Sequence, residues 1–392
     1  MKIALWLSLF IVFYAFFGYG ILLYFIIKIK RIVKGKPVIP PVDEGLLPSC
    51  SLIIAAYNEE DFIDEKIANT LSLRYPAGKL QLIFVTDGST DRTPELVAAY
   101  PQIKHMHSEA RKGKLAAVHR VLKEVTTDVI VFTDANTFLN ADALINICRH
   151  YADPVVGAVA GEKRVATSAA DDATAGEGFY WKYESKLKTW DSELLTVVGA
   201  AGELFSIRTN LYPEIPANSI IEDFMTSLLV AAKGYRVIYE PEAYAMENSS
   251  DSVKEELKRK IRIAAGGIQS IVWLKKLLNP FPKPILTFQY VSHRVLRWTV
   301  VPFLMIAALI LNIVIVRSGY DSLVYDLLLA GQIIFYSMAL LGWLLETRQI
   351  KVKILFIPYY FCMMNYAVVR GIMRYISGTQ SAIWEKAKRK EA

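Results

Sequence analysis

Residues 128–136, DVIVFTDAN, constrain the fold more than any other stretch of this sequence. Residues 129–132 are almost uniformly apolar and rich in β-branched side chains, which is typical of a strand buried on both faces of a parallel sheet. Asp134 and Asn136 follow at once, at the end of the strand where open α/β sheets bind ligands. Their oxygens suit Mg²⁺ or Mn²⁺ shared with the phosphates of a nucleotide, although Asp134 could instead cap a following helix.

The composition predicts a membrane protein with an inserted soluble domain. Hydrophobic residues make up 53% of the chain and aromatic residues 12%, and the apolar residues are bunched rather than spread. The net charge of +7 is modest, and the basic clusters lie beside apolar spans, which favours anionic lipid over nucleic acid as their partner. The three cysteines show no paired spacing, which predicts neither a disulfide framework nor a zinc site and suits reducing cytosol.

The N-terminal residues 3–27 form an apolar stretch long enough to cross a bilayer as one helix. A secretory signal peptide would have a shorter apolar core and a small-residue cleavage site, whereas basic residues follow here directly. Those basic residues place the following chain in the cytoplasm. We therefore expect a transmembrane anchor over residues 1–30 and a proline-rich linker over residues 31–50.

Residues 51–250 are expected to form the soluble domain, because strand and helix patterns alternate along them. Each predicted strand ends in polar loop residues. The strands are expected at 51–55, 80–85, 103–107 and 128–133, and helices at 62–73, from Pro94 onwards and at 115–125. This alternation predicts βαβ units and a parallel α/β sheet.

The polar loops after these strands contain further candidate ligand-binding residues. Asp87 can accept hydrogen bonds from a base or ribose, and Gly88 lets a ligand approach the backbone closely. The loop 111–114, RKGK, is cationic and suits a diphosphate, although a single Lys-Gly-Lys sequence is common in solvated loops. Together with Asp134, these groups predict a nucleotide-diphosphate site.

Several segments resemble, in order and spacing, the motifs of family 2 inverting glycosyltransferases with the GT-A fold. They are AAYNE at 55–59, TDGSTD at 86–91, KGK at 112–114, TDAN at 133–136, GAAGELF at 199–205 with Arg208, and IEDF at 221–224. The similarity covers roughly residues 51–267. With its apolar flanks, the chain is similar to the membrane-integrated branch, which includes hyaluronan, cellulose and poly-N-acetylglucosamine synthases. The resemblance implies a GT-A domain with a mixed, mostly parallel sheet, flanked by transmembrane and interfacial helices.

The resemblance also implies a role for each matching residue. Asp223 would be the general base for the acceptor hydroxyl and Glu222 would orient it, although acids are also favoured at a helix N-terminus. Mg²⁺ or Mn²⁺ would be ligated by Asp134 and Asn136. The donor would be bound by Tyr57, Glu59, Asp87, Lys112, Lys114 and Arg262, and the acceptor by Gly202 and Phe205. Trp181 is a further acceptor-binding candidate, because of its aromatic ring and not because of the resemblance.

Two departures from the family pattern affect this prediction. Asn136 stands where the metal motif usually ends in Asp; its carbonyl oxygen can still ligate, more weakly or through water. The Gln-x-x-Arg-Trp motif of processive members is matched only by residues 259–263, RKIRI, which keep Arg262 but lack Gln and Trp. This loss weakens the case for a processive polymerase. Trp181 and Trp190 could stack on the acceptor instead, although packed core aromatics are more common.

The remaining chain is expected to lie in or on the membrane. Residues 251–290 form an amphipathic, basic series that predicts interfacial helices, with core-facing helices as the alternative. Residues 291–346 are expected to contain two transmembrane helices, at 299–316 and 323–345. Within residues 347–392, a third crossing at 354–376 would place the basic tail outside. We therefore favour an interfacial or re-entrant helix there over a third transmembrane helix.

These features predict a multi-pass protein of the plasma or inner membrane with a cytoplasmic catalytic domain. Its expected activity is inverting transfer of a sugar from a nucleotide-diphosphate donor, expected to be a UDP-sugar, to a saccharide or lipid-linked acceptor in polysaccharide or glycoconjugate synthesis. Two alternatives stay open: non-processive transfer of one sugar to a polyprenyl-linked acceptor, and non-catalytic nucleotide-sugar binding. The presence of both Asp134 and Asp223 counts against the second, because a binding protein has no use for a general base. No nucleic-acid partner is expected, and an accessory subunit is left open.

Overall fold

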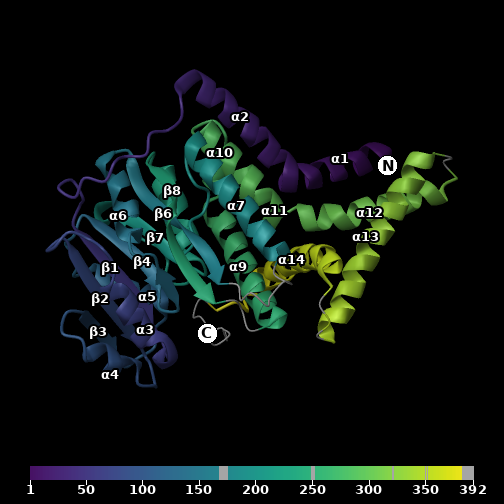
Figure 1. The fold of residues 1–392 in the computed structure, drawn as a ribbon. Coiled ribbons are helices and arrows are strands. Elements are labelled where there is room, and N and C mark those ends of the chain that lie inside the picture. Colours follow the sequence, from purple (N-terminus) through teal and green to yellow (C-terminus); the bar gives the residue numbers. More distant parts are fainter. Residues whose placement is uncertain (167–174, 249–251, 320–321, 349, 351, 382–392) are drawn as a thin grey trace. The chain divides into compact units, whose positions relative to one another are not determined.

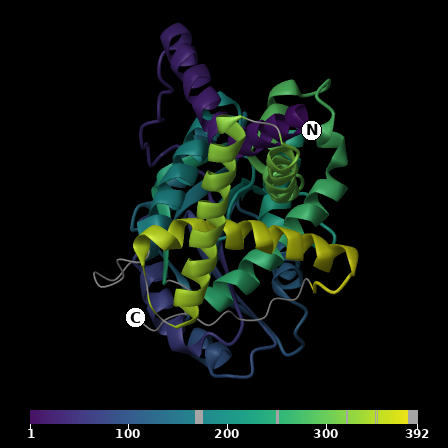
Figure 2. The ribbon, with the colours of Figure 1, turned by 90° about the vertical axis from the view of Figure 1, so that its right-hand side faces the viewer.

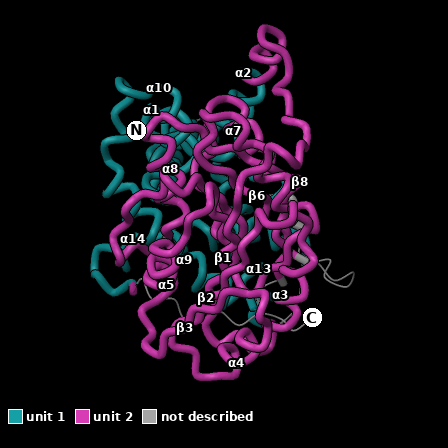
Figure 3. Tube along the Cα trace, turned by 90° about the vertical axis from the view of Figure 1, so that its left-hand side faces the viewer, with its two compact units in different colours: residues 1–26, 167–184, 252–380 teal, residues 27–166, 185–251, 381–392 magenta. Residues whose placement is uncertain are grey.

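The computed structural model describes the chain except for residues 167–174, 249–251, 320–321, 349, 351 and 382–392 (Figure 1). It divides into two units (Figure 3). Met1–Ile26, Thr167–Glu184 and Ser252–Gln380 form the helical unit, and Ile27–Ala166, Ser185–Asp251 and Ser381–Ala392 form the sheet unit. Each unit is described separately below.

An eight-stranded sheet forms the centre of the sheet unit, in the order β3-β2-β1-β4-β7-β6-β8-β5. Its strands are β1 (Cys50–Ala56), β2 (Leu80–Asp87), β3 (Lys104–Ser108), β4 (Val129–Asp134), β5 (Thr137–Leu139), β6 (Val156–Ala166), β7 (Leu204–Arg208) and β8 (Arg236–Asn248). The first four strands in this order are mutually parallel, whereas β7 runs antiparallel to both β4 and β6, and β5 runs antiparallel to β8. The predicted mixed, mostly parallel sheet is confirmed.

Strand β4 lies inside the sheet, between β1 and β7, and its side chains are buried on both faces. Val129, Ile130 and Val131 of β4 are all fully buried, although successive side chains of a strand point to opposite faces. The strand is therefore covered on both faces, as its uninterrupted apolar sequence predicts.

Five helices among the described residues lie wholly in this unit. They are α3 (Glu60–Leu71), α4 (Thr93–Ala98), α5 (Lys114–Leu122), α6 (Ala143–Cys148) and α8 (Glu222–Ala232), with short 3₁₀ turns η2 (Arg149–Ala152) and η4 (Thr209–Leu211). Helices α3, α4 and α5 lie where the sequence predicts helices. Helix α3 buries Ile63 and Ile67 in the core. The division between the two units falls within α2 (Tyr19–Lys34) and α7 (Ala175–Leu194).

Two basic residues at the end of α2 contact the C-terminal end of α7. The guanidinium of Arg31 binds both carboxylate oxygens of Glu193 in α7, at 2.8 and 2.6 Å. Lys30 donates to the carbonyl oxygens of Glu193 and Leu194 at the C-terminal end of the same helix, where a cation is favoured. The assignment of the basic flank to anionic lipid stays a prediction.

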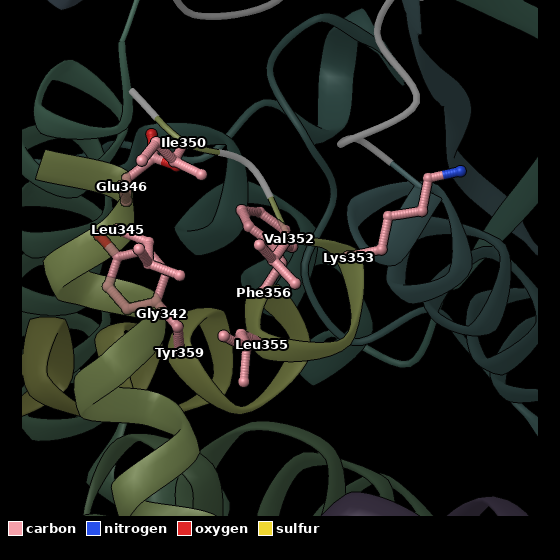
Figure 4. A pocket seen from close by; sticks show the side chains of 9 residues that line it. All are labelled: Gly342, Leu345, Glu346, Ile350, Val352, Lys353, Leu355, Phe356 and Tyr359. Carbon is pink, nitrogen blue, oxygen red and sulfur yellow. The ribbon is translucent and has the colours of Figure 1, made fainter. Parts of the chain in front are cut away.

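The helical unit is built from long apolar and amphipathic helices. They are α1 (Lys2–Phe13), η1 (Tyr14–Gly18), α9 (Val253–Trp273), η5 (Lys275–Leu278), α10 (Pro284–Tyr290), η6 (Val291–Val295), α11 (Leu296–Trp298), α12 (Val301–Arg317), α13 (Leu323–Thr347) and α14 (Lys353–Ile376), of which η1 and η6 are π-helical. Helix α14 crosses α13 (Figure 2). A hollow between them is lined by Gly342, Leu345, Glu346, Ile350, Val352, Lys353, Leu355, Phe356 and Tyr359 (Figure 4). A Cβ at Gly342 would lie 2.7 Å from the carbonyl oxygen of Leu355, so this glycine permits the close crossing.

Two helices among the described residues are long and apolar enough to cross a membrane, namely Lys2–Lys34 and Leu323–Thr347. The expected span at 299–316 is less simple, because α12 meets the criteria only together with Pro284–Trp298, from which it is bent by 60°. Helix α14 does not meet them, and its interfacial placement stays a prediction. The proposed domain limits also remain predictions.

Candidate active site

The carboxyl ends of three parallel strands meet at one edge of the sheet. In the register of β1 with its neighbours, Ala55 lies opposite Asp134 of β4 and Ala56 lies opposite Thr86 of β2. The loops that follow β1, β2 and β4 therefore leave the sheet side by side. This arrangement brings the AAYNE, TDGSTD and TDAN segments together, as the sequence predicts.

Lys114 connects the carboxylate of Asp134, at the end of β4, with that of Glu222, at the start of α8. It is the first residue of α5, and its Nζ lies 2.5 Å from Oδ1 of Asp134 and 3.7 Å from Oε1 of Glu222. Burial alone would lower the pKa of Lys114, but the negative charges of Asp134, Glu222 and Asp223 raise it above its ordinary value. Lys114 is therefore a charged lysine within an acidic cluster.

Asp223 lies in the same cluster, in the first turn of α8. A Cβ at Gly202 would lie 3.3 Å from Oδ2 of Asp223 and 3.6 Å from Nζ of Lys114, so the glycine segment passes directly beside both groups. Burial, and then the charge of Glu222, raise the pKa of Asp223 from 3.8 to about 7, although Lys114 opposes the change. A carboxylate with this pKa can accept a proton near neutral pH.

Asp87 has a different environment from the one that the resemblance implies. Its side chain is buried, and Oδ2 accepts hydrogen bonds from the backbone N–H groups of Lys112 and Gly113, at 2.8 and 2.7 Å. Gly113 has φ +93°, a conformation that side chains rarely adopt. Asp87 thus holds the cationic loop in place, and its contact with a nucleoside stays a prediction.

An arginine that the sequence analysis left unassigned stacks on a predicted donor residue. The guanidinium carbon of Arg111 lies 3.7 Å from the centre of the Tyr57 ring. The adjoining loop is braced by Asn58, whose Oδ1 accepts a hydrogen bond from the backbone N–H of Thr90 at 2.8 Å. The backbone N–H of Glu59 donates to Thr93 Oγ1, also at 2.8 Å. The alternation of motifs indicates that these loops are neighbours, but it gives no signal for the Arg111 pairing.

Phe205 is not brought into this cluster, and two further predicted residues, Trp181 and Arg262, belong to the other unit. Phe205 is 2% exposed and lies opposite Phe132 and Ala160 on the adjoining strands, so its ring packs in the core and is closed to an acceptor. Trp181 and Arg262 belong to the helical unit, where Nζ of Lys260 lies 5.2 Å from the Trp181 ring. The predicted roles of Trp181 and Arg262 at the site stay predictions.

The residues present fit a divalent ion that is shared with the substrate. The helix-capping alternative for Asp134 is wrong, because β5 follows it and α6 begins after Asp142. Asp134 already holds a cation, the ammonium of Lys114. No cluster of three or more His, Cys, Asp or Glu residues suitable for a metal occurs among the described residues. Mg²⁺ is commonly held by one or two carboxylates together with substrate phosphates, a set that Asp134 and Asn136 could complete.

Comparison with known proteins defines the class. Residues 51–215 match the family Glycosyl transferase family 2. The chain therefore carries a family 2 glycosyltransferase domain, and the predicted enzyme class is confirmed.

Two characterised relatives and one solved structure refine this comparison. The chain is 27% identical over 288 residues to a poly-beta-1,6-N-acetyl-D-glucosamine synthase of Staphylococcus aureus, an alignment that covers 69% of this chain and 67% of that protein. It is 31% identical over 167 residues to a beta-monoglucosyldiacylglycerol synthase of Nostoc sp., an alignment that covers 41% of this chain and 35% of that protein. Mannosyltransferase PcManGT from Pyrobaculum calidifontis, solved with GDP-Man and Mn²⁺, superposes with a TM-score of 0.70 at 24% identity, covering 95% of this chain and 99% of that one. This last likeness establishes the GT-A fold.

Proposed function

We propose that this chain is a membrane-bound inverting glycosyltransferase that moves a sugar from a UDP-sugar to a saccharide acceptor in polysaccharide or glycoconjugate synthesis. The observation that carries the proposal is the convergence of Asp134, Lys114, Glu222 and Asp223 at the carboxyl edge of the sheet. The name of the Staphylococcus aureus relative supports a saccharide acceptor.

The donor diphosphate would lie against Asp134, Asn136 and the loop that Asp87 holds. A divalent ion bound by Asp134 and Asn136 would supply positive charge where the departing nucleotide becomes an anion. Lys112 and Lys114 would donate charge-assisted hydrogen bonds to the phosphate oxygens. Because two hydrogen bonds to Asp87 fix the backbone of this loop, Lys112 would need little backbone rearrangement to bind the donor. The Lys114 ammonium would have to move from Asp134 to the phosphates as the ion binds.

Asp223 would act as the base in the transfer step. The acceptor hydroxyl attacks the anomeric carbon on the face opposite the diphosphate, so the new bond to the acceptor oxygen forms as the bond to the phosphate oxygen breaks, and the configuration inverts. The hydroxyl proton passes to the Asp223 carboxylate. Glu222 would hold Lys114 and keep the pKa of Asp223 raised through its negative charge.

Transfer of a single sugar to a lipid-linked acceptor is the second candidate function. The sequence of α9 favours it, because residues 259–263 lack the Gln and Trp of the processive motif. The name of the Nostoc relative, beta-monoglucosyldiacylglycerol synthase, also supports a lipid acceptor. A non-catalytic nucleotide-sugar-binding protein is less well supported, since a binding protein has no use for a general base such as Asp223.

The membrane placement is part of the same proposal. Helices Lys2–Lys34 and Leu323–Thr347 would span the cell membrane, with the bent pair as a third crossing and α9 and α14 at the cytoplasmic interface. The sheet unit would then face the cytoplasm, where nucleotide sugars are made.

The test is an incubation of the purified full chain in nanodiscs with Mn²⁺ and a panel of radiolabelled UDP-sugars and GDP-sugars. Oligosaccharides and a polyprenyl phosphate are offered in separate reactions, and the products are sized. We expect a saccharide product from a UDP-sugar; a single-sugar lipid would establish the second candidate instead. Binding of a donor without transfer to any acceptor would refute both.

A further inference from the structure

Lys66 is a lysine with no exposed surface in the sheet unit. It lies on the inner face of α3, which also buries Ile63, Ile67 and Thr70. Its position in this stripe is one where an amphipathic helix ordinarily places an apolar residue. Lysine is almost never fully buried unless its charge is compensated, so the position calls for an explanation.

The ammonium of Lys66 contacts the two residues that flank the predicted metal-binding turn. Its Nζ donates to Thr133 Oγ1 at 3.3 Å and to the carbonyl oxygen of Thr137 at 2.5 Å. Thr133 is the residue before Asp134, and Thr137 is the residue after Asn136. Lys66 therefore hydrogen-bonds to both ends of the turn that carries the predicted metal ligands Asp134 and Asn136.

The two threonines extend this contact to the site itself. Thr137 Oγ1 donates to the carbonyl oxygen of Asp134 at 2.9 Å and lies 3.0 Å from Thr133 Oγ1. Thr133 Oγ1 donates to the carbonyl oxygen of Glu203, the neighbour of Gly202, at 2.9 Å. Replacing Lys66 would thus disturb hydrogen bonds that hold the Asp134 backbone and the glycine segment beside Asp223.

A purely structural role does not require a lysine here. Methionine would fill the same space, and burying an apolar side chain is less costly than burying an ammonium whose acceptors are uncharged. Burial lowers the pKa of Lys66 to about 7, while the carboxylate of Asp134 opposes this effect. The carboxylate that interacts with the Lys66 charge is therefore that of Asp134, the predicted metal ligand.

We propose that Lys66 is a positioning residue that fixes the Asp134–Asn136 turn in the geometry needed for a divalent ion and a nucleoside diphosphate. The inference rests on the proposed function and adds a residue that touches neither the donor nor the metal. Residues that orient metal ligands in this way ordinarily change metal affinity by 10-fold to 100-fold when they are replaced.

The test compares Lys66→Met with Lys79→Met in the full chain. Lys79 also donates to backbone carbonyls, those of Glu44, Gly45 and Leu47, but it precedes the opposite end of β2. Calorimetry at pH 7 measures Mn²⁺ binding in the presence of UDP and, in a parallel titration, of GDP, and thermal unfolding measures stability. We expect Lys66→Met to raise the Kd for Mn²⁺ by about tenfold or more, with an unfolding midpoint close to that of Lys79→Met and with Lys79→Met binding Mn²⁺ normally.

Other outcomes would overturn the inference. Equal Mn²⁺ affinity for the unaltered chain and folded Lys66→Met would show that Lys66 is only a packing residue, while leaving the proposed function intact. Failure of the unaltered chain to bind Mn²⁺ with either nucleotide would overturn both proposals. If Lys66→Met does not fold, Thr137→Val decides the question, because it removes the hydroxyl that holds the Asp134 carbonyl; unchanged Mn²⁺ affinity in that variant would refute the role of the turn.

Discussion

Replacing Asp223 by Asn should abolish sugar transfer and, at the same time, stabilise the protein at alkaline pH. Asparagine keeps the shape of the side chain but cannot take the acceptor proton. The donor contacts proposed for Asp134 and the cationic loop are untouched, so donor binding should persist. Loss of transfer with retained donor binding is the functional half of the prediction.

The stability half follows from the raised pKa of Asp223. The folded protein holds this proton up to about pH 7, whereas the unfolded chain releases it near pH 3.8. The folded state therefore loses stability as the pH rises between these values, and the penalty is complete above pH 7. At about 1.4 kcal/mol per pKa unit, a rise from 3.8 to about 7 corresponds to at most about 4 kcal/mol. Asp223 is only partly buried by its exposed area, and contact with solvent reduces this figure.

Thermal unfolding at pH 4.5 and pH 8 tests this reasoning directly. Asp223→Asn should unfold at a higher temperature than the unaltered chain at pH 8, and the two should differ little at pH 4.5. Glu214→Gln, a change at an exposed carboxylate of the same unit, is the matched control and should show no such difference. A stabilisation of equal size at both pH values, or turnover by Asp223→Asn, would refute the assignment of the base.

Three further predictions concern the same cluster. In the unaltered chain, the rate of transfer should rise roughly tenfold between pH 6 and pH 8 as Asp223 ionises. Glu222→Gln should move this rise to lower pH, because it removes a negative charge that raises the pKa of Asp223. A pH–rate profile that is flat, or that does not move in the variant, would contradict this prediction. EDTA should stop transfer and added Mn²⁺ should restore it, whereas Asp134→Ala should not be restored; insensitivity to EDTA would remove Asp134 from its metal role. Gly202→Ala should lower kcat by about tenfold or more with little change in the donor Kd, since the added methyl would lie 3.3 Å from the Asp223 carboxylate. Equal losses in kcat and donor affinity would argue against the placement of Gly202 on the acceptor side of the site.

The fold and the order of the site loops could be predicted because both depend on local patterns. The apolar run of β4 and the polar residues that end each strand are visible in the sequence, and parallel pairing then brings those ends to one edge. Asp223 is different, because its place at the same site was predicted only from the resemblance of residues 221–224 to a family motif. Neither the strand pattern nor the resemblance needs knowledge of side-chain contacts.

Other features depend on partners that are distant in sequence. The sequence does not show that Asp87 turns towards the backbone of the cationic loop, that Arg111 covers Tyr57, or that Phe205 is closed off between two strands. Lys66 does leave a signal, because a lysine interrupts the apolar stripe of α3, but only the structure shows which turn it contacts. The break before α12 was missed because hydropathy measures length and not bending.

The way in which Asp87 holds its loop has a consequence for engineering this enzyme. Both of its short hydrogen bonds are to peptide N–H groups, which every residue except proline provides. The side chains at positions 111 and 112, now Arg111 and Lys112, can therefore be varied in a library to any residue except proline without losing the hydrogen bonds that hold the loop in place. Selection on such a library could shift the preference for one nucleotide over another while the scaffold is inherited unchanged.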